Sequence, residues 1–245
     1  MPALPHPSSR RGDRRRASTA LAAAAGLLAL MGTAAAGASD SPEQPRRLPA
    51  PTLASAEPAK PGLETAVLSG GCFWGVQGVF QHVRGVSKVT AGYSGGAWTT
   101  AHYELVGSGT TGHAESIRIV FDPRVISYGE ILRIFFSVAT DPTQLNAQFP
   151  DRGRQYRSDV FYADKAQKAE ALAYISQLEA AKAFDRPIVT RVDPLTGFYQ
   201  AESYHQDYLY HHPDAPYIAT FDAPKLAALK VLFPGEYEPK PVLAY

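Results

Sequence analysis

The sequence lacks a second cysteine: Cys72 is the only one among 245 residues. A chain with one thiol cannot form an internal disulfide, so no disulfide framework can hold this fold together. The lone thiol is therefore either buried and inert, which is the commoner fate of a free cysteine, or retained for chemistry. The sequence around Cys72 provides the evidence that distinguishes these two interpretations.

A strong charge of either sign is also missing, since the formal net charge is only +1. Five arginines and one aspartate give residues 1–38 a net charge of +4, which leaves −3 on the remainder of the chain. A mildly acidic body gives no electrostatic reason to expect nucleic-acid binding. We therefore expect no nucleic-acid partner.

The sequence has one long apolar run, from Ala17 to Ala38, and it follows the basic stretch "RRGDRRR". The run ends in Ala36-Gly37-Ala38, a small-x-small cleavage pattern, and this layout is typical of a bacterial secretory signal. We expect a signal peptide over residues 1–38, export to the periplasm by the general secretory or twin-arginine route, and no stable membrane insertion after cleavage. An uncleaved membrane anchor and a plastid leader are the alternatives.

The rest of the chain divides into a linker and one domain. Residues 39–62 are Pro-rich and polar, so they bury little apolar surface and are expected to form a flexible linker. Residues 63–245 have the size of a single folded domain. No internal repeat and no second change of composition divides this domain further, and we expect it to be a monomer.

Hydrophobic periodicity predicts alternating strands and helices in this domain. Strands are expected at residues 64–69, within 85–96, and at 115–122, 158–163 and 186–195. Helices are expected from Phe73 onward and at residues 127–139, 164–184 and 200–212. An irregular C-terminal tail is expected after these elements. This order predicts an α+β two-layer sandwich with a mixed β-sheet and a ferredoxin-like split βαβ core.

Cys72 lies at an expected strand-to-helix turn, directly after Gly70 and Gly71. Unpaired N–H groups and the positive end of the dipole at a helix N-terminus favour the thiolate, which is the nucleophilic form. The two glycines allow a substrate or a backbone to approach closely. Phe73 and Trp74 follow, and they either form an apolar pocket beside the sulfur or belong to the core.

Glu115 begins an alternating strand and shares its parity with Ile117, Ile119 and Phe121. If this face meets the core, burial raises the pKa of Glu115 and keeps it protonated at neutral pH. A solvated glutamate at the end of the strand is the alternative. A nucleophilic sulfur and a neutral acid are the two groups that reductive attack on an S=O bond needs.

Several polar residues could complete such a site. Buried tyrosine hydroxyls donate hydrogen bonds to a polarised oxygen, although each of these residues taken singly is more commonly structural. The candidates are Tyr103, Asp151, Tyr156 and Tyr217.

These residues lie in a series of motifs that is specific when taken together. In chain order the motifs are "GGCFWGVQGVF", "AGYSGG", "YELVGSGTTGHAESIRIVFDP", "ATDPTQLN", "DRGRQYRS" and "YHQDYL". The chain resembles the A-type peptide-methionine (S)-S-oxide reductases, the MsrA family, from about Thr65 to Lys225.

The resemblance implies an activity and a role for each candidate residue. Cys72 would attack the sulfoxide sulfur of oxidised methionine, and Glu115 would protonate its oxygen. Tyr103 and Tyr156 would hold and polarise that oxygen. Substrate binding would fall to Phe73, Trp74, Asp151 and, on a looser match, Tyr217. The resemblance implies no metal and no organic cofactor, and the substrate would be methionine sulfoxide in peptides and proteins or in free form.

The chain departs from the family pattern in three places. Many relatives carry resolving cysteines in the C-terminal tail, whereas this tail has none, as in other single-cysteine members. A Cys72 sulfenic acid would then need an external reductant: a thioredoxin-like or glutaredoxin-like protein, or a small thiol. Phe149 and Arg154 replace residues that are usually small, beside the expected substrate loop.

Two other functions remain open on the sequence alone. Cys72 could pair with His113 or His205 as a nucleophile and base for acyl transfer, or react with peroxide. His205, His211 and His212 could instead form a metal site in a protein that is not an enzyme. A purely structural domain would leave the motifs around Cys72 and Glu115 unexplained.

Overall fold

The computed structural model describes residues 44–53 and 62–245. The predicted signal peptide and its cleavage site lie outside these residues, so their prediction stands untested. Within the described ranges, none of the helices combines the length and the apolar character needed to cross a bilayer.

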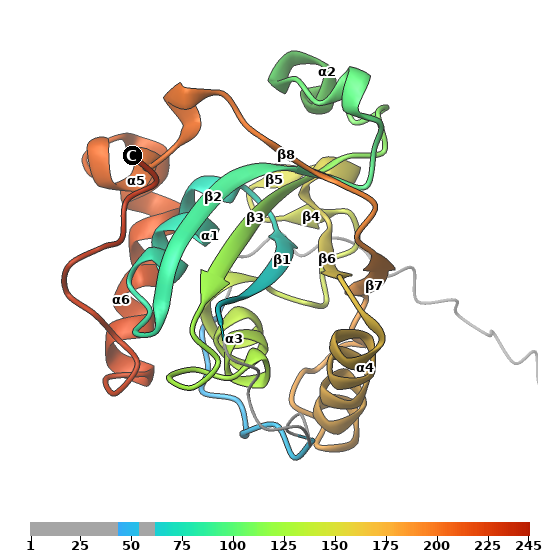
Figure 1. Ribbon diagram of the computed structural model, residues 1–245, viewed down its shortest axis with the longest axis vertical. Helices are drawn as coiled ribbons and strands as arrows, with labels where there is room; N and C mark the ends of the chain where they lie inside the picture. The colour runs from blue at the N-terminus through green and yellow to red at the C-terminus, as the bar shows by residue number, and fades with distance from the viewer. Residues whose placement is uncertain (1–43, 54–61) are drawn as a thin grey trace, which may run out of the picture. The chain divides into compact units, whose positions relative to one another are not determined.

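The domain is built on a six-stranded sheet with the order β7-β6-β1-β3-β2-β8 (Figure 1). The strands are β1 (Glu64–Gly70), β2 (Val86–Ser94), β3 (Ala114–Phe121), β6 (Ser158–Tyr162), β7 (Arg191–Pro194) and β8 (Phe198–Gln200). A separate short pair joins β4 (Ala147–Gln148) to β5 (Asp151–Arg152). Only the β6–β7 pairing is parallel, which makes the sheet mixed, as predicted.

The centre of the sheet has the predicted split βαβ arrangement. Strand β3 lies between β1 and β2 and is antiparallel to both, while β1 lies between β6 and β3. The four central strands therefore follow the order of a ferredoxin-like core, with a helix in each crossover. The predicted fold class, an α+β sandwich with a mixed sheet, is confirmed.

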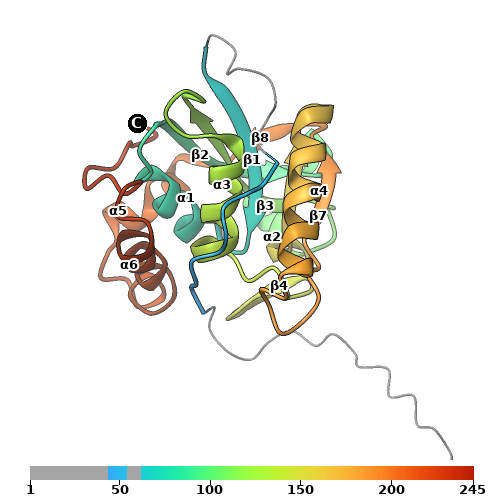
Figure 2. The same ribbon diagram turned by 90° about the horizontal axis from the view of Figure 1, so that it is seen from below.

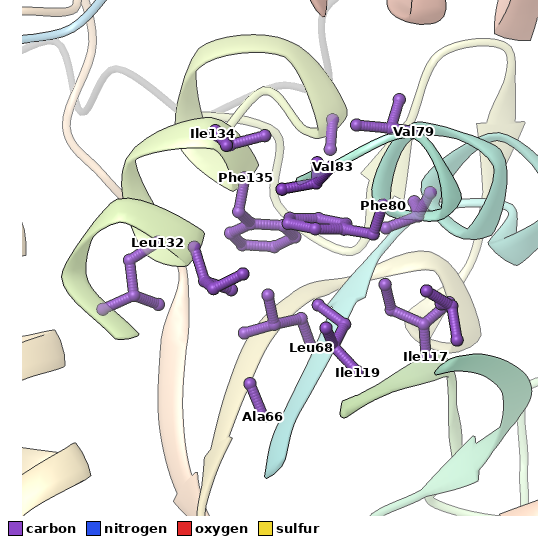
Figure 3. Packing of buried hydrophobic residues seen from close by; sticks show 14 of the residues in the cluster. Ala66, Leu68, Val79, Phe80, Val83, Ile117, Ile119, Leu132, Ile134 and Phe135 are labelled. Atoms are coloured by element: carbon purple, nitrogen blue, oxygen red, sulfur yellow. The ribbon is translucent and has the colours of Figure 1, made fainter. Parts of the chain in front are cut away.

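Helices cover one face of this sheet and enclose the main core (Figure 2). They are α1 (Phe73–Gln81), α3 (Tyr128–Ile134) and α4 (Lys165–Ala180), with α6 (Ala223–Leu232) packed beside α1. Figure 3 shows Phe80 of α1 and Phe135, which follows α3, meeting over Leu68 and Ile119 of the sheet. The core fixes the position of α1, and the cysteine directly precedes the first turn of this helix.

Two helix starts follow from capping residues in the sequence. Ser127 Oγ accepts the backbone N–H of Glu130 at 3.1 Å, and Asp164 Oδ1 accepts that of Gln167 at 2.9 Å. These bonds satisfy N–H groups that the first helical turn leaves without partners. The helices expected over residues 127–139 and 164–184 therefore begin where the sequence placed them. The helix after Ser127 continues past Ile134 as a π-helical turn, Phe135–Ala139.

The predicted helix over residues 200–212 is wrong. Residues 198–200 form strand β8, and only a short turn, Ser203–His205, and α5 (Tyr208–His211) are helical. Asp207 between them has a left-handed backbone, with φ of 57°. Its N–H donates to Gln77 Oε1 at 2.9 Å, so a contact with α1 interrupts the helix.

Three further elements differ from the prediction. The strand expected at 186–195 is limited to β7, and α2 (Tyr103–Gly107) was not foreseen. The tail expected to be irregular after Pro213 forms a π-helical turn, Ile218–Asp222, and then α6. Residues 213–215 and the residues that follow α6 match the predicted irregular tail.

The end of that tail is held at the C-terminal end of α1. The N–H of Val242 donates to the carbonyl of Gln81 at 2.9 Å, and the N–H of Ala244 donates to Asp207 Oδ1 at 2.9 Å. Gln81 is the last residue of α1, whereas Cys72 precedes its first residue. Nine helical residues, at a rise of 1.5 Å each, separate the two ends by about 13 Å.

Residues 44–53, which we call the N-terminal strap, also differ from the prediction of a flexible linker over 39–62. The strap runs across α3 and α4 (Figure 2), and the side chain of Leu48 is only 3% exposed in the main core. Arg133 Nε donates to the carbonyl of Leu48 at 2.8 Å, and the hydroxyl of Tyr174 donates to that of Pro49 at 2.9 Å. The packed structure therefore includes residues ahead of the predicted domain start at 63.

Glu170 of α4 lies beneath the strap and makes the stability of the domain depend on pH. Burial raises the pKa of Glu170 to about 7, partly opposed by a hydrogen bond from the Gly129 N–H. The folded state therefore binds this proton more tightly than the unfolded state does. The stabilisation is complete below the ordinary pKa of 4.5 and is lost as pH rises through about 7.

Glu170→Gln is therefore expected to raise the Tm relative to the unmodified protein, by an amount that grows between pH 4.5 and pH 8. Thermal unfolding followed by circular dichroism at a series of pH values measures this difference. Glu179→Gln is the matched control, since Glu179 is exposed on the same helix. A Tm difference that is constant across this range would contradict the prediction.

Candidate active site

Cys72 occupies the predicted strand-to-helix turn and is the N-cap residue of α1. Its side chain is 8% exposed. Gly71 before it has φ of +94°, a conformation that side-chain-bearing residues rarely adopt. A Cβ at Gly71 would lie 2.5 Å from Cβ of Gln148, so the β4 strand can pack closely beside the turn only because this residue is glycine.

Glu115 meets the same helix terminus from the sheet. It lies on β3 with the core-facing parity that the sequence predicted, and it is 3% exposed. Its Oε2 accepts the backbone N–H of Phe73 at 3.0 Å, which satisfies one of the free donors of the first turn. Burial raises the pKa of Glu115 to about 8, with smaller contributions from Asp151 and Asp222. The alternative of a solvated glutamate is excluded, and the carboxyl is mostly protonated at neutral pH.

The ionisation state of Cys72 differs from the expectation that its helix terminus would favour the thiolate. Burial raises the pKa of Cys72 well above its ordinary value, and the negative charge of Glu115 raises it further. Asp222 and Asp151 act in the same direction. The backbone N–H of Trp74 lowers the pKa, but desolvation outweighs it. Cys72 is therefore a neutral thiol at neutral pH.

Tyr103 and Tyr156 lie close enough to Cys72 and Glu115 for their charges to interact. The pKa of each tyrosine is raised, mainly by burial and next by the charge of Glu115. Both hydroxyls therefore stay protonated and remain hydrogen-bond donors over the physiological pH range. Tyr103 begins α2, and Tyr156 ends a short helical turn, Arg154–Tyr156.

Asp151 and Tyr217 form a second polar pair at the site. The hydroxyl of Tyr217 donates to Asp151 Oδ2, although the two residues are 66 positions apart in sequence. Burial raises the pKa of Asp151, while this hydrogen bond and Lys225 lower it. The ring of Tyr217 meets Trp74 edge-on at 5.9 Å. The structure thus places Tyr217, whose match to the family was the loosest, against two other candidate residues, Asp151 and Trp74.

The two aromatic residues after Cys72 differ in their surroundings. Phe73 is 1% exposed and lies in the main core, with its ring 5.8 Å from that of Tyr93. Trp74 is only partly buried and stacks on Tyr208, with ring centroids 3.9 Å apart. Phe73, which shares the helix stripe of Val76 and Phe80, therefore belongs to the core, whereas Trp74, which lies off the centre of that stripe, is partly exposed beside the turn.

Sequence reasoning gave Tyr208 no role and considered His205 only as a base or a ligand. His205 is 2% exposed and its Nδ1 accepts the indole N–H of Trp74 at 3.1 Å, while its ring lies 4.4 Å from that of Tyr103. His205 and Tyr208 thus orient Trp74, and His205 also packs against Tyr103. In the sequence, the position of His205 and Tyr208 within the motif "YHQDYL" was the one signal that could have indicated a role at the site.

The contacts do not favour the two alternative functions. No hydrogen bond joins Cys72 to His113 or His205 within the described part of the chain, and His113 Nε2 lies 2.9 Å from the carbonyl of Ala97. His211 and His212 are exposed, whereas His205 is buried. Residues 44–53 and 62–245 contain no group of three His, Cys, Asp or Glu side chains arranged to hold a metal ion.

A cysteine thiol, a neutral carboxylic acid and two tyrosines interact with one another at one helix terminus. Such a site can attack an electrophilic centre, protonate the oxygen bound to it and stabilise charge on that oxygen. All eight residues predicted for the site lie on or beside the N-terminal turn of α1 or interact electrostatically with it.

Comparisons with known proteins agree with this geometry. A family model described as peptide methionine sulfoxide reductase matches residues 64–234. The chain is 57% identical over 187 residues to peptide methionine sulfoxide reductase MsrA 2 of Mesorhizobium japonicum, covering 76% of this chain and 96% of that protein. It is 54% identical over 165 residues to MsrA 2 of Synechocystis sp., covering 67% and 77%.

Two solved structures share the fold. Mxr1 from Saccharomyces cerevisiae in reduced form gives a TM-score of 0.58 at 28% identity, covering 66% of this chain and 93% of that one. Methionine sulfoxide reductase A of Corynebacterium diphtheriae gives 0.54 at 30% identity, covering 73% and 89%.

The α+β fold and the thiol beside a neutral acid define the class, a thiol-dependent oxidoreductase. The chain belongs to the peptide methionine sulfoxide reductase family, and its enzymatic activity is that of a peptide-methionine (S)-S-oxide reductase.

Proposed function

We propose that the enzyme reduces methionine-S-sulfoxide by attack of Cys72 on the sulfoxide sulfur, with Glu115 as the proton donor. The observation that carries this proposal is the meeting of the two groups at the start of α1. Glu115 accepts the Phe73 N–H at 3.0 Å, and Phe73 is the residue directly after Cys72. A carboxyl with a pKa of about 8 still holds its proton at neutral pH.

Protonation is needed because the oxygen of a sulfoxide is a poor leaving group until it carries a proton. Tyr103 and Tyr156 would donate hydrogen bonds to the same oxygen as charge develops on it. Trp74, with Tyr217 and Asp151 behind it, would hold the methyl group and backbone of the substrate. Phe73 supports this wall from the core side.

The atoms and electrons of the step balance within the site. A bond forms between Sγ of Cys72 and the sulfoxide sulfur, and the protonated oxygen leaves as hydroxide when the sulfur–oxygen bond breaks. Hydroxide then adds to Sγ, the bond between the two sulfurs breaks, and the products are methionine and a Cys72 sulfenic acid. The substrate sulfur gains two electrons and Cys72 loses two. Glu115 gives its proton to the oxygen and regains one from the thiol, so no net proton is consumed.

Recycling of the sulfenic acid would require an external thiol. Cys72 is the only cysteine of the sequence. The tail, where relatives can carry resolving cysteines, is held by Gln81 and Asp207 at the far end of α1. A first thiol would displace water to form a mixed disulfide with Cys72, and a second would release the enzyme. Thioredoxin-like proteins, glutaredoxin-like proteins and small thiols all fit this chemistry.

The predicted signal peptide supports a place for the enzyme outside the cytoplasm, where it would repair oxidised exported proteins under oxidative stress. This location, cleavage near Ala38 and the monomeric state are predictions made from the sequence. Free methionine sulfoxide fits the same chemistry as the protein-bound form.

The test is turnover of the two epimers of a blocked methionine sulfoxide with dithiothreitol as reductant. We expect methionine from the S epimer only, and loss of turnover in Cys72→Ser, because a hydroxyl is a far weaker nucleophile toward sulfur. Dimedone labelling followed by mass spectrometry should find the sulfenic acid when reductant is omitted.

Ser69→Ala is a suitable control, since Ser69 lies near the turn and, among the residues that the structure describes, its hydroxyl bonds to Ser116 at 2.7 Å and to no group of the site. It is expected to keep the turnover. If neither epimer is converted by protein whose thiol is titratable, the proposal is wrong. His113→Ala would then test the acyl-transfer alternative.

A further inference from the structure

A second buried carboxylate, Asp222, lies against the first turn of α1. It ends the π-helical turn Ile218–Asp222 and is 0% exposed. A Cβ at Gly75 would lie 2.1 Å from Asp222 Oδ1 and 2.5 Å from its Cγ. The carboxylate therefore rests on the backbone of Gly75, three residues after Cys72, at a spacing that only glycine permits.

The side chain of Asp222 makes no capping hydrogen bond to the helix α6 that follows it. Neither of its oxygens has a hydrogen-bond partner among the described residues, and the Nζ of Lys225 lies 3.8 Å from Oδ1. Burying a carboxylate without hydrogen bonds destabilises a protein. Hydrophobic residues of similar volume at such positions commonly give a more stable protein. Packing alone therefore gives no reason for an acid at this place.

The charge of Asp222 acts on the chemistry of the site. Burial raises the pKa of Asp222 to about 6, so the group is mostly ionised at neutral pH. Its negative charge then opposes the positive end of the α1 dipole, which otherwise favours a thiolate at the N-cap. The titratable and charged groups that face Asp222 or share its field are Lys225 on α6, Asp151 on β5, Tyr217, Glu115 on β3 and Cys72 itself.

We propose that Asp222 is a positioning residue whose charge helps to keep Cys72 a neutral thiol before substrate binds. It would act through the first turn of α1 and touch neither substrate nor reductant. Two consequences follow. Cys72 reacts slowly with electrophiles other than the substrate, and the thiol keeps the proton that later replaces the one donated by Glu115. This second consequence rests on the proposed function, whereas the first does not.

The test is the rate at which iodoacetamide alkylates Cys72 in the purified protein between pH 5 and pH 11. Because the sequence has one cysteine, intact mass reports this reaction alone. Asp222→Asn keeps the shape and removes the charge. We expect its labelling curve to move to lower pH, with a rate at pH 7.5 roughly tenfold higher, since one pKa unit changes the thiolate fraction tenfold.

Asp185→Asn is the matched control, because Asp185 is exposed after α4 and the substitution changes the net charge equally. Its labelling curve is expected to coincide with that of the unmodified protein. Asp222→Ser also removes the charge, and it replaces Asp222→Asn in the test if the asparagine variant does not fold. Labelling in urea gives the rate of the unprotected thiol for every variant.

A curve unchanged in both Asp222 variants overturns the proposal. A rate in native buffer equal to the rate in urea also overturns it, because this result marks exposure of the thiol rather than loss of a charge. The reductase pH profile is an independent readout. Removing Asp222 lowers the pKa of Glu115, so the alkaline decline of kcat/KM should begin at lower pH. Alkylation needs no sulfoxide, so its result stands even if the epimer assay fails.

Discussion

Glu115→Gln is expected to lower kcat/KM for methionine-S-sulfoxide by roughly 10²- to 10⁴-fold, the usual contribution of a positioned general acid. The amide has nearly the shape of the carboxyl and still accepts the Phe73 N–H that Glu115 accepts at 3.0 Å. It has no proton to give to the sulfoxide oxygen. The loss should therefore appear in kcat, with a small change in KM. Steady-state kinetics with the blocked S epimer measure both values.

The same residue sets the expected pH dependence. Because burial raises the pKa of Glu115 to about 8, kcat/KM should decline as pH rises through 8 and the acid loses its proton. The folded state also binds this proton more tightly than the unfolded one, so wild-type stability falls as pH rises from about 4.5 to about 8. The glutamine variant should lack this loss of stability.

Glu104→Gln is the control for this pair of measurements. Glu104 is exposed in the first turn of α2, next to Tyr103, and the substitution removes one carboxylate near the site without touching the helix terminus. Its kinetics should match those of the unmodified enzyme. A Glu115→Gln variant within fivefold of wild type would rule out Glu115 as the proton donor.

The position of Glu115 could be predicted because it depends on local periodicity. A residue with the parity of Ile117 and Ile119 must face the same side of a strand, and the core lies on that side. The capping residues Ser127 and Asp164 are local signals of the same kind. The alternation of strands and helices likewise predicted the split βαβ core, since few topologies fit that order.

The features that the sequence did not predict depend on contacts between distant segments. The ionisation of Cys72 follows from burial and from carboxylates 43 to 150 positions further along the chain, none of which a helix-terminus argument includes. The helix expected over 200–212 is interrupted because Gln77 and Gln81 of α1 bind the backbone and side chain of Asp207. In both cases, tertiary contacts outweigh local preference.

The N-terminal strap gives the second large expected effect, on stability. Leu48→Ala should lower the free energy of unfolding by about 2–4 kcal/mol, since it leaves a cavity under a fixed backbone. Deleting residues 44–53 should cost more, because Ser137, Arg133, Tyr174 and Gln177 also lose hydrogen-bond partners. Urea unfolding followed by fluorescence measures both. Catalysis in the folded fraction should persist, because the strap packs on α3 and α4 rather than on the first turn of α1.

Leu53 offers a matched control in the same segment, since it is 46% exposed where Leu48 is 3% exposed. Leu53→Ala should change stability by less than about 0.5 kcal/mol. Equal effects of the two substitutions would mean that the strap does not pack as an element of the core, and residues 39–62 would then behave as the linker that their composition suggests. A large effect at Leu48 alone would mean that the strap packs as part of the core through this side chain, because Leu48 is buried there and Leu53 is not.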